Sequence, residues 1–215
     1  KQVWSDQITE IGGGKWLQYT SRRPVTHLFL DSRKYFSGDG SVFFAVKGVA
    51  HNGHEFLAEL YKRGIRQFIV ESEVDISEMP DANILKVDKT ISFLQKLAAY
   101  KRKQFTNPVI GITGSNGKTI IKEWLYQVLE KDYSIVKSPG SYNSQIGVPL
   151  SVWPVNSWHT LGIIEAGISH SGEMENRCEG SRPDMGSCTN LLRAQDEGFM
   201  AREVKAREKA KGGRY

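Results

Sequence analysis

The chain has 215 residues, of which 39% are hydrophobic and 25% charged, a composition typical of a globular protein with one or two domains. It contains no apolar run of the ~20 residues that a membrane-spanning helix needs, and its first residues lack the apolar core of a secretory signal. Cys178 and Cys188 are too few for a disulfide framework or a four-ligand zinc site. We therefore expect a protein of the reducing cytoplasm, without membrane insertion.

The charge balance weakly favours anionic partners. The chain carries 29 Lys and Arg residues against 24 Asp and Glu residues, a formal net charge of +5. The basic residues are spread along the sequence and no nucleic-acid motif accompanies them. We therefore expect a phosphate-rich small ligand and no nucleic acid.

The first half of the chain alternates short apolar segments with helical patterns. These patterns predict strands at 25–30, 41–46, 67–70 and 84–87 and a helix at 55–63. Thr90 is suited to be the N-cap of a second helix. Pro108 interrupts that pattern, so we place a domain boundary between residues 106 and 107.

The second half alternates in the same way. It predicts strands at 109–113, 134–136, 161–165 and 185–189, and helices at 118–130, 144–152, 172–178 and the C-terminus. Such alternation favours an α/β fold with parallel strands. We expect a small α/β domain over 1–106, then a P-loop NTPase-like, mostly parallel sheet flanked by helices over 107–215.

A phosphate-binding loop is the sharpest motif. Residues 111–119 read GITGSNGKT, follow an apolar strand and open a helix. Glycines let successive backbone N–H groups face one concavity, and the helix N-terminus favours a phosphate there. Lys118 can reach the β- and γ-phosphates, and the Thr119 hydroxyl can hold Mg²⁺. The strict pattern would need a glycine at Ile112, so an ordinary glycine-rich turn is the alternative.

A second metal ligand is expected from the next apolar run. Residues 160–165 end in Glu165, which places its carboxylate at the carboxyl edge of a parallel sheet, beside the phosphate loop. A nucleotide-bound Mg²⁺ commonly takes such an acidic ligand. The alternative is a surface glutamate at a strand end.

Several motifs in this order resemble the ATP-dependent Mur ligases of peptidoglycan precursor synthesis. The second half has the GxTGxxGKT loop, SYNSQIGVP at 141–149, EAG at 165–167 and TN at 189–190, and the first half has DSR at 31–33, FFAVKG at 43–48 and NGHEF at 52–56. The resemblance covers residues 26–211. It is strongest to the members that add D-alanyl-D-alanine, including the form fused to alanine racemase.

The resemblance implies an ATP-dependent ligase that forms a C–N bond in cell-wall synthesis. In the family, the γ-phosphoryl group of ATP passes to the peptide carboxylate of UDP-N-acetylmuramoyl-tripeptide. The amine of D-alanyl-D-alanine then attacks the acyl phosphate, which leaves ADP and phosphate as the other products.

The resemblance also implies roles for individual residues. Lys118 and Glu165 are expected to be catalytic, and Thr119 and Glu165 to hold Mg²⁺. The expected ATP-binding residues are Gly114, Ser115, Asn116, Gly117, Lys118, Thr119 and Ile120. The expected substrate-binding residues are Ser32, Arg33, Lys47, Asn52, His54, Asn143, Ser144 and Gln145.

A carbamylated lysine and a second metal site are further implications. Alignment from Glu197 places Lys209 at the position of the carbamylated, catalytic lysine, with Lys211 as the near alternative and a solvated lysine as the other reading. The family histidine that helps bind the second metal is Gln195 here, whose amide oxygen can still ligate Mg²⁺. Asn52 likewise stands where the family commonly has Asp.

The length of the chain agrees with two of the family's three domains. The third, which closes over ATP and the amine, is expected to be absent and the second incomplete, so the fragment should bind ligands but ligate poorly. One alternative is another Mur-type ligase, which adds diaminopimelate or lysine. A different one is a catalytically silent nucleotide- or UDP-sugar-binding module.

Overall fold

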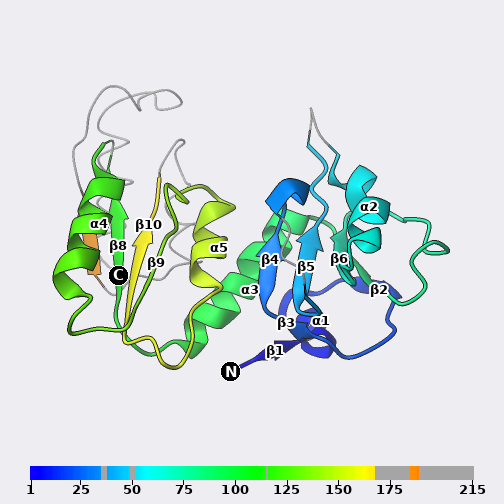
Figure 1. Cartoon of the computed structure of the whole chain (residues 1–215), viewed down its shortest axis with the longest axis horizontal. Coiled ribbons are helices and arrows are strands. Elements are labelled where there is room, and N and C mark those ends of the chain that lie inside the picture. Colours follow the sequence, from blue (N-terminus) through cyan, green and yellow to red (C-terminus); the bar gives the residue numbers. More distant parts are fainter. Residues whose placement is uncertain (35–37, 49–51, 115, 168–184, 189–215) are drawn as a thin grey trace. The chain divides into compact units, whose positions relative to one another are not determined.

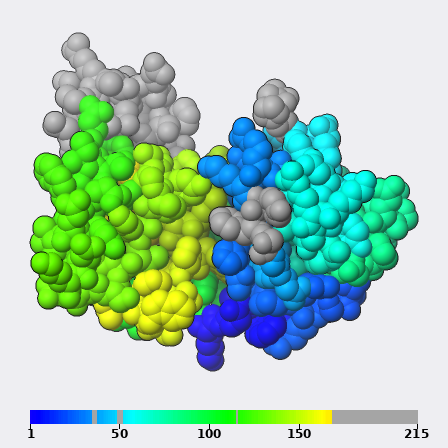
Figure 2. All heavy atoms as spheres, in the orientation of Figure 1, coloured from blue at the N-terminus to red at the C-terminus, as the bar shows by residue number. Residues whose placement is uncertain are grey.

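The computed structural model describes residues 1–34, 38–48, 52–114, 116–167 and 185–188. The chain forms two compact units, Lys1–Leu97 and Ala98–Tyr215, which are shown as ribbons in Figure 1 and as filled atoms in Figure 2. The division falls inside helix α3 (Thr90–Gln104), earlier than the expected boundary at 106/107. None of the helices in the described ranges is long and apolar enough to cross a membrane.

The first unit is built on a five-stranded sheet with the order β2-β7-β6-β5-β4. Four strands run parallel: β4 (His27–Phe29), β5 (Ser41–Phe44), β6 (Gln67–Val70) and β7 (Asn83–Lys86). The remaining strand, β2 (Lys15–Gln18), pairs antiparallel with β7. Every residue of β5 and β6 is buried, as expected for parallel strands covered on both faces.

Helices cover the two faces of this sheet. Phe43 packs in one core cluster with Leu57 and Leu60 of α2 (Leu57–Lys62). The next residue of the strand, Phe44, meets Phe93 of α3, with ring centroids 6.3 Å apart. Because successive strand residues point to opposite faces, α2 and α3 lie on opposite sides of the sheet.

The N-terminal segment forms elements that the sequence patterns did not predict. They are β1 (Val3–Trp4), η1 (Ser5–Gln7), α1 (Ile8–Gly12) and β2. The expected strand at 25–30 is divided in two. Val25 in β3 (Pro24–Val25) pairs with β1, and β4 joins the main sheet. Between them, the N–H groups of Thr26 and His27 both donate to the carbonyl of Gly40.

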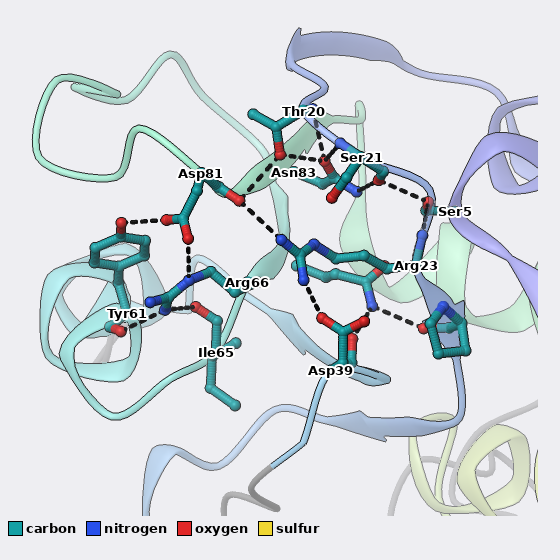
Figure 3. A network of polar contacts seen from close by, with 12 residues as sticks. Ser5, Thr20, Ser21, Arg23, Asp39, Tyr61, Ile65, Arg66, Asp81 and Asn83 are labelled. Atoms are coloured by element: carbon teal, nitrogen blue, oxygen red, sulfur yellow. Dashed lines mark hydrogen bonds and ion pairs between the residues drawn. The ribbon is translucent and has the colours of Figure 1, made fainter.

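Buried amide side chains fix the amino-terminal edge of the parallel strands. Gln67, the first residue of β6, donates to the carbonyls of Pro24 and Asp39, each at 2.8 Å. Asn83, the first residue of β7, donates to the carbonyl of Ser21 at 2.7 Å (Figure 3). These bonds use the amide N–H groups of both side chains within the fold. The loops at the carboxyl edge are therefore the natural place for a ligand.

Two helices of the first unit begin differently from the prediction. The expected helix at 55–63 is a 3₁₀ turn, η3 (Gly53–Phe56), followed by α2. Helix α3 includes Thr90 as its first residue rather than as its N-cap, and the cap comes from another element. Glu71 Oε1 accepts from both the N–H and the hydroxyl of Thr90, each at 2.8 Å.

The second unit has a four-stranded, fully parallel sheet with the order β11-β8-β10-β9. Its strands are β8 (Val109–Thr113), β9 (Ile135–Lys137), β10 (Leu161–Glu165) and β11 (Met185–Cys188). Ile112 and Ile163 pack under α4 (Lys118–Leu129), whereas Ile164 packs with Val148 of α5 (Gly147–Val152) in a second cluster. The predicted α/β class is therefore confirmed.

The expected helix at 144–152 begins only at Gly147, whose N–H donates to the Ser144 hydroxyl at 3.0 Å. The expected helices at 172–178 and at the C-terminus lie outside the described residues.

Candidate functional site

The predicted phosphate loop connects β8 to α4. Gly117 precedes α4 in the left-handed region, with φ of 79°, a conformation that glycine adopts without a Cβ penalty. Gly114, directly after β8, also has a positive φ of 149°. The first N–H groups of α4 have no intrahelical acceptors, so this turn offers the donors that an anion needs. Ser115 lies outside the described residues.

The Lys118 side chain folds back over this loop. Its Nζ atom donates to the carbonyl of Gly114 at 2.9 Å, and the residue is buried. The Thr113 hydroxyl at the end of β8 is also buried, and it has no hydrogen-bond partner within the part of the chain that the structure describes. An ammonium and an unpaired hydroxyl beside helix N–H groups suit a phosphate.

The two predicted metal ligands lie side by side. The Thr119 hydroxyl is 3.0 Å from Glu165 Oε2 and 3.2 Å from Oε1. They meet because β10 pairs parallel with β8, so both strands end at one edge. Asn143, from the loop after β9, donates to Glu165 Oε1 at 2.8 Å. A hydroxyl and a carboxylate are hard oxygen ligands of the kind that Mg²⁺ takes.

Two residues around Glu165 were missed by the sequence analysis. Lys122 is completely buried, and its Nζ atom lies 3.6 Å from Glu165 Oε2. The Ser138 hydroxyl accepts from the Glu165 N–H at 2.9 Å. A signal for Lys122 was present, because it stands four residues after Lys118 and so shares its face of α4. Ser138 carried no comparable signal.

The other predicted residues of this unit fall into three groups. The Ser144 hydroxyl accepts from the first N–H of α5, and Gln145 is exposed in the same loop. Ile120 is 57% exposed on the first turn of α4, so only its backbone N–H could contribute to the phosphate site. The expected metal ligand Gln195 and the candidate carbamylated lysines Lys209 and Lys211 lie outside the described residues. Among the described ranges, no cluster of three or more His, Cys, Asp or Glu residues could hold a metal.

The first unit has a pocket at the carboxyl edge of its sheet. Its volume is about 600 Å³, and it is lined by Leu30, Asp31, Ser32, Arg33, Val46, Gly48, Gly53 and Phe56. Ser32 and Arg33 belong to η2 (Ser32–Lys34), which follows β4. The pocket therefore collects the DSR motif and parts of two other motifs, although they are distant in sequence.

Arg33 makes a two-point contact at the pocket. Its Nε and Nη2 atoms donate to the two carboxylate oxygens of Asp31, at 2.9 and 2.8 Å. These bonds hold the pKa of Asp31 at about 2. The Arg33 side chain is 85% exposed, so its charge faces solvent and a ligand could reach it.

The predicted residues Asn52, His54 and Lys47 lie beside this pocket. Lys47 is exposed, and its backbone pairs with that of Asn52. Asn52 Oδ1 lies 2.8 Å from His54 Nδ1, and His54 Nε2 accepts from the Glu71 N–H at 3.0 Å. Burial lowers the pKa of His54. Both ring nitrogens are therefore used within the fold, so the structure gives His54 a supporting position.

Comparison with known families gives two matches. Residues 24–102 match the Mur ligase family catalytic domain, and residues 112–211 match the Mur ligase middle domain. The two matches cover both units and include both candidate sites.

Individual relatives agree with these matches. The UDP-N-acetylmuramoyl-tripeptide–D-alanyl-D-alanine ligase of Borreliella burgdorferi is 32% identical over 88% of this chain and 42% of its own length. A crystal structure of MurF from Acinetobacter baumannii superposes with a TM-score of 0.86 at 27% identity, over 99% of this chain and 46% of that one. A crystal structure of MurF from Thermotoga maritima in complex with ADP superposes with a TM-score of 0.76 at 32% identity, over 87% of this chain and 43% of that one. The chain thus spans less than half the length of these relatives.

Proposed function

We propose that this chain, which belongs to the Mur ligase family, carries the nucleotide-binding and UDP-substrate-binding parts of a D-alanyl-D-alanine-adding ligase. The observation that supports this most is the contact of Thr119 with Glu165 at the start of a phosphate-loop helix. The proposed cellular site is the bacterial cytoplasm.

In this proposal the second unit binds ATP. The N–H groups at the start of α4 and the Lys118 ammonium hold the phosphates, and the ammonium exchanges its bond to Gly114 for phosphate oxygens. Thr119 and Glu165 hold Mg²⁺, which would neutralise charge on the phosphate oxygens. One carboxylate suffices because the phosphates supply further oxygen ligands. Gln195 and Lys209 remain candidates for a second metal.

The reaction is the formation of an amide bond. A carboxylate is a poor electrophile, so its oxygen first accepts the γ-phosphoryl group and ADP leaves. The amine nitrogen of D-alanyl-D-alanine then attacks the carbonyl carbon, phosphate leaves, and the nitrogen loses a proton. Lys118 and the α4 N–H groups contribute by fixing the phosphates and stabilising negative charge on their oxygens.

The first unit would hold the UDP part of UDP-N-acetylmuramoyl-tripeptide in the pocket beside η2. Arg33 and Lys47 present exposed cations there, and an arginine fork suits a diphosphate. Ser32 adds a hydroxyl at the pocket wall. Asn52 and His54 would shape the loop of this pocket. In the second unit, Asn143, Ser144 and Gln145 remain proposed substrate-binding residues.

Calorimetric titration tests both halves of this proposal. We expect UDP-N-acetylmuramoyl-tripeptide to bind better than UDP, and Mg²⁺-ATP to bind independently. Arg33→Ala should weaken the UDP ligands about tenfold, the loss expected for one charge-assisted contact, and Lys118→Ala should weaken only ATP. Arg63→Ala is the matched control, since Arg63 has an exposed ion pair with Glu59 and does not line the pocket. Binding of ATP without any UDP ligand would overturn the assignment of the first unit.

A further inference from the structure

Lys122 occupies an unusual place for a lysine. It lies on the inner side of α4 and has no exposed surface, and fully buried lysines are rare in proteins unless they are paired. Lys118, one helical turn earlier, belongs to the proposed phosphate site. Lys122 has no role in that site as described so far, so its burial needs another explanation.

The Lys122 ammonium has one hydrogen bond and ion-pair contacts with two carboxylates. Nζ donates to the carbonyl of Gly140, and it lies 3.4 Å from Glu123 Oε1 and 3.6 Å from Glu165 Oε2. Glu123 is in turn paired with Lys137. An ammonium that contacts three oxygen atoms in this way is restrained in position, and so are the groups that it contacts.

Glu165 needs such a partner. It is 1% exposed, and a buried carboxylate is costly unless a counter-charge and hydrogen bonds compensate it. Thr119 and Asn143 supply neutral donors, and Lys122 supplies a positive charge on Oε2. The same ammonium reaches Gly140, in the loop that carries Asn143, so it links α4 to the ends of two strands.

We propose that Lys122 is a positioning residue that holds the Glu165 carboxylate, and the loop at 138–143 with it, in the place where Glu165 can bind the Mg²⁺ of a nucleotide. The inference rests on the proposed nucleotide-binding function. Removal of the ammonium would leave Glu165 free to turn toward other donors, so the cost should appear in metal-dependent binding. Partners that orient a metal ligand typically contribute 10–100-fold to metal affinity.

The test measures ADP affinity of the 215-residue chain by calorimetry, with Mg²⁺ and with a chelator. We expect the gain in ADP affinity that Mg²⁺ causes to be at least about tenfold smaller in Lys122→Met than in the wild type. The ADP affinity measured with a chelator should change little. Lys137→Met is the matched control, because Lys137 belongs to the same charge cluster through Glu123 but has no ion pair with Glu165. This control should keep the full gain.

A double-mutant cycle separates positioning from a merely structural role. If Lys122 acts through Glu165, then Lys122→Met should cause no further loss of the Mg²⁺ effect in a Glu165→Gln background. Additive losses, or a folded Lys122→Met variant with the wild-type Mg²⁺ effect, would overturn the inference. If the unmodified chain binds no nucleotide, the proposed function fails instead.

A polar replacement provides a second variant in case Lys122→Met does not fold. Lys122→Gln keeps a donor within the core but removes the charge, and it should show the same loss. If neither variant folds, an NMR experiment on the unmodified chain tests the inference. The Nζ resonance of Lys122, assigned through its own side chain, should shift when Mg²⁺ is added to the ADP-bound chain. An unchanged resonance would contradict the inference.

Discussion

Asn52 and His54 form a short contact beside the pocket of the first unit, with 2.8 Å between Asn52 Oδ1 and His54 Nδ1. The Glu71 N–H donates to Nε2 of the same ring at 3.0 Å, so Nε2 is the acceptor and Nδ1 carries the proton. The ring is therefore neutral in this arrangement. It joins the end of β6 to the start of η3, two elements that border the pocket edge of the sheet.

This arrangement predicts that the first unit loses stability in mild acid. Burial, the largest effect, and Lys47 lower the pKa of His54 below its ordinary value of 6.5, and Glu71 only partly opposes them. The unfolded chain therefore takes up the proton more readily, so stability is complete above about pH 6.5 and falls as the pH decreases below it. Urea unfolding of the wild type and of His54→Gln between pH 5 and 8 measures the difference.

The comparison with His54→Gln also isolates the residue. Burial lowers the pKa of His159 as well, but His159 is present in both proteins and its effect cancels in the difference. Two stability curves that run parallel from pH 8 to pH 5 would show that His54 does not carry the effect.

Replacing Asn52 with aspartate should reverse this behaviour. Asn52→Asp places a carboxylate at His54 Nδ1, and an opposite charge at hydrogen-bond distance favours the protonated ring. We expect the pKa of His54 to rise toward or above its ordinary value, so that the loss of stability below about pH 6.5 becomes smaller. NMR titration of the imidazole signals measures this directly, and a ring that titrates as in the wild type would refute it.

Glu71 should stabilise the first unit through helix α3. Its carboxylate accepts hydrogen bonds from the N–H and the hydroxyl of Thr90 at the helix start. A negative charge at this end of a helix also interacts favourably with the helix dipole. We expect Glu71→Ala to lower the free energy of unfolding by about 1–2 kcal/mol, the usual effect of removing a helix cap. Glu73→Ala is the control, since Glu73 lies two residues further on and makes an exposed ion pair with Lys86. Equal melting temperatures for the two variants would contradict the capping role.

Gly53 should tolerate no side chain. A Cβ atom there would lie 2.9 Å from both Ala45 Cα and Val46 N, and these are backbone atoms that cannot turn aside. We expect Gly53→Ala to cost about 1–3 kcal/mol of stability, as overpacking does elsewhere, and to weaken UDP binding because Gly53 lines the pocket. Thermal unfolding together with UDP titration tests this. A variant with unchanged melting temperature would show that the loop can move away.

The sequence by itself determined the alternation of strands and helices, the phosphate loop and the carboxylate of Glu165. These features depend on residues that are close in the sequence. An apolar run predicts a strand, and the residues directly after it lie at the strand's carboxyl end. Helix α4, predicted at 118–130 from its local sequence pattern, spans Lys118–Leu129. The resemblance to the Mur ligases also grouped DSR and NGHEF as parts of one expected substrate site, and Arg33 and Gly53 line the same pocket.

Tertiary structure alone decided which side chains pair across long separations. The ammonium of Lys122 meets Glu165, the carboxylate of Glu71 caps Thr90, and both ring nitrogens of His54 are used within the fold. The unpredicted N-terminal strands also depend on packing with distant residues. Periodicity reports which face of an element is buried, but strand register and helix packing select the partner that each buried group finds.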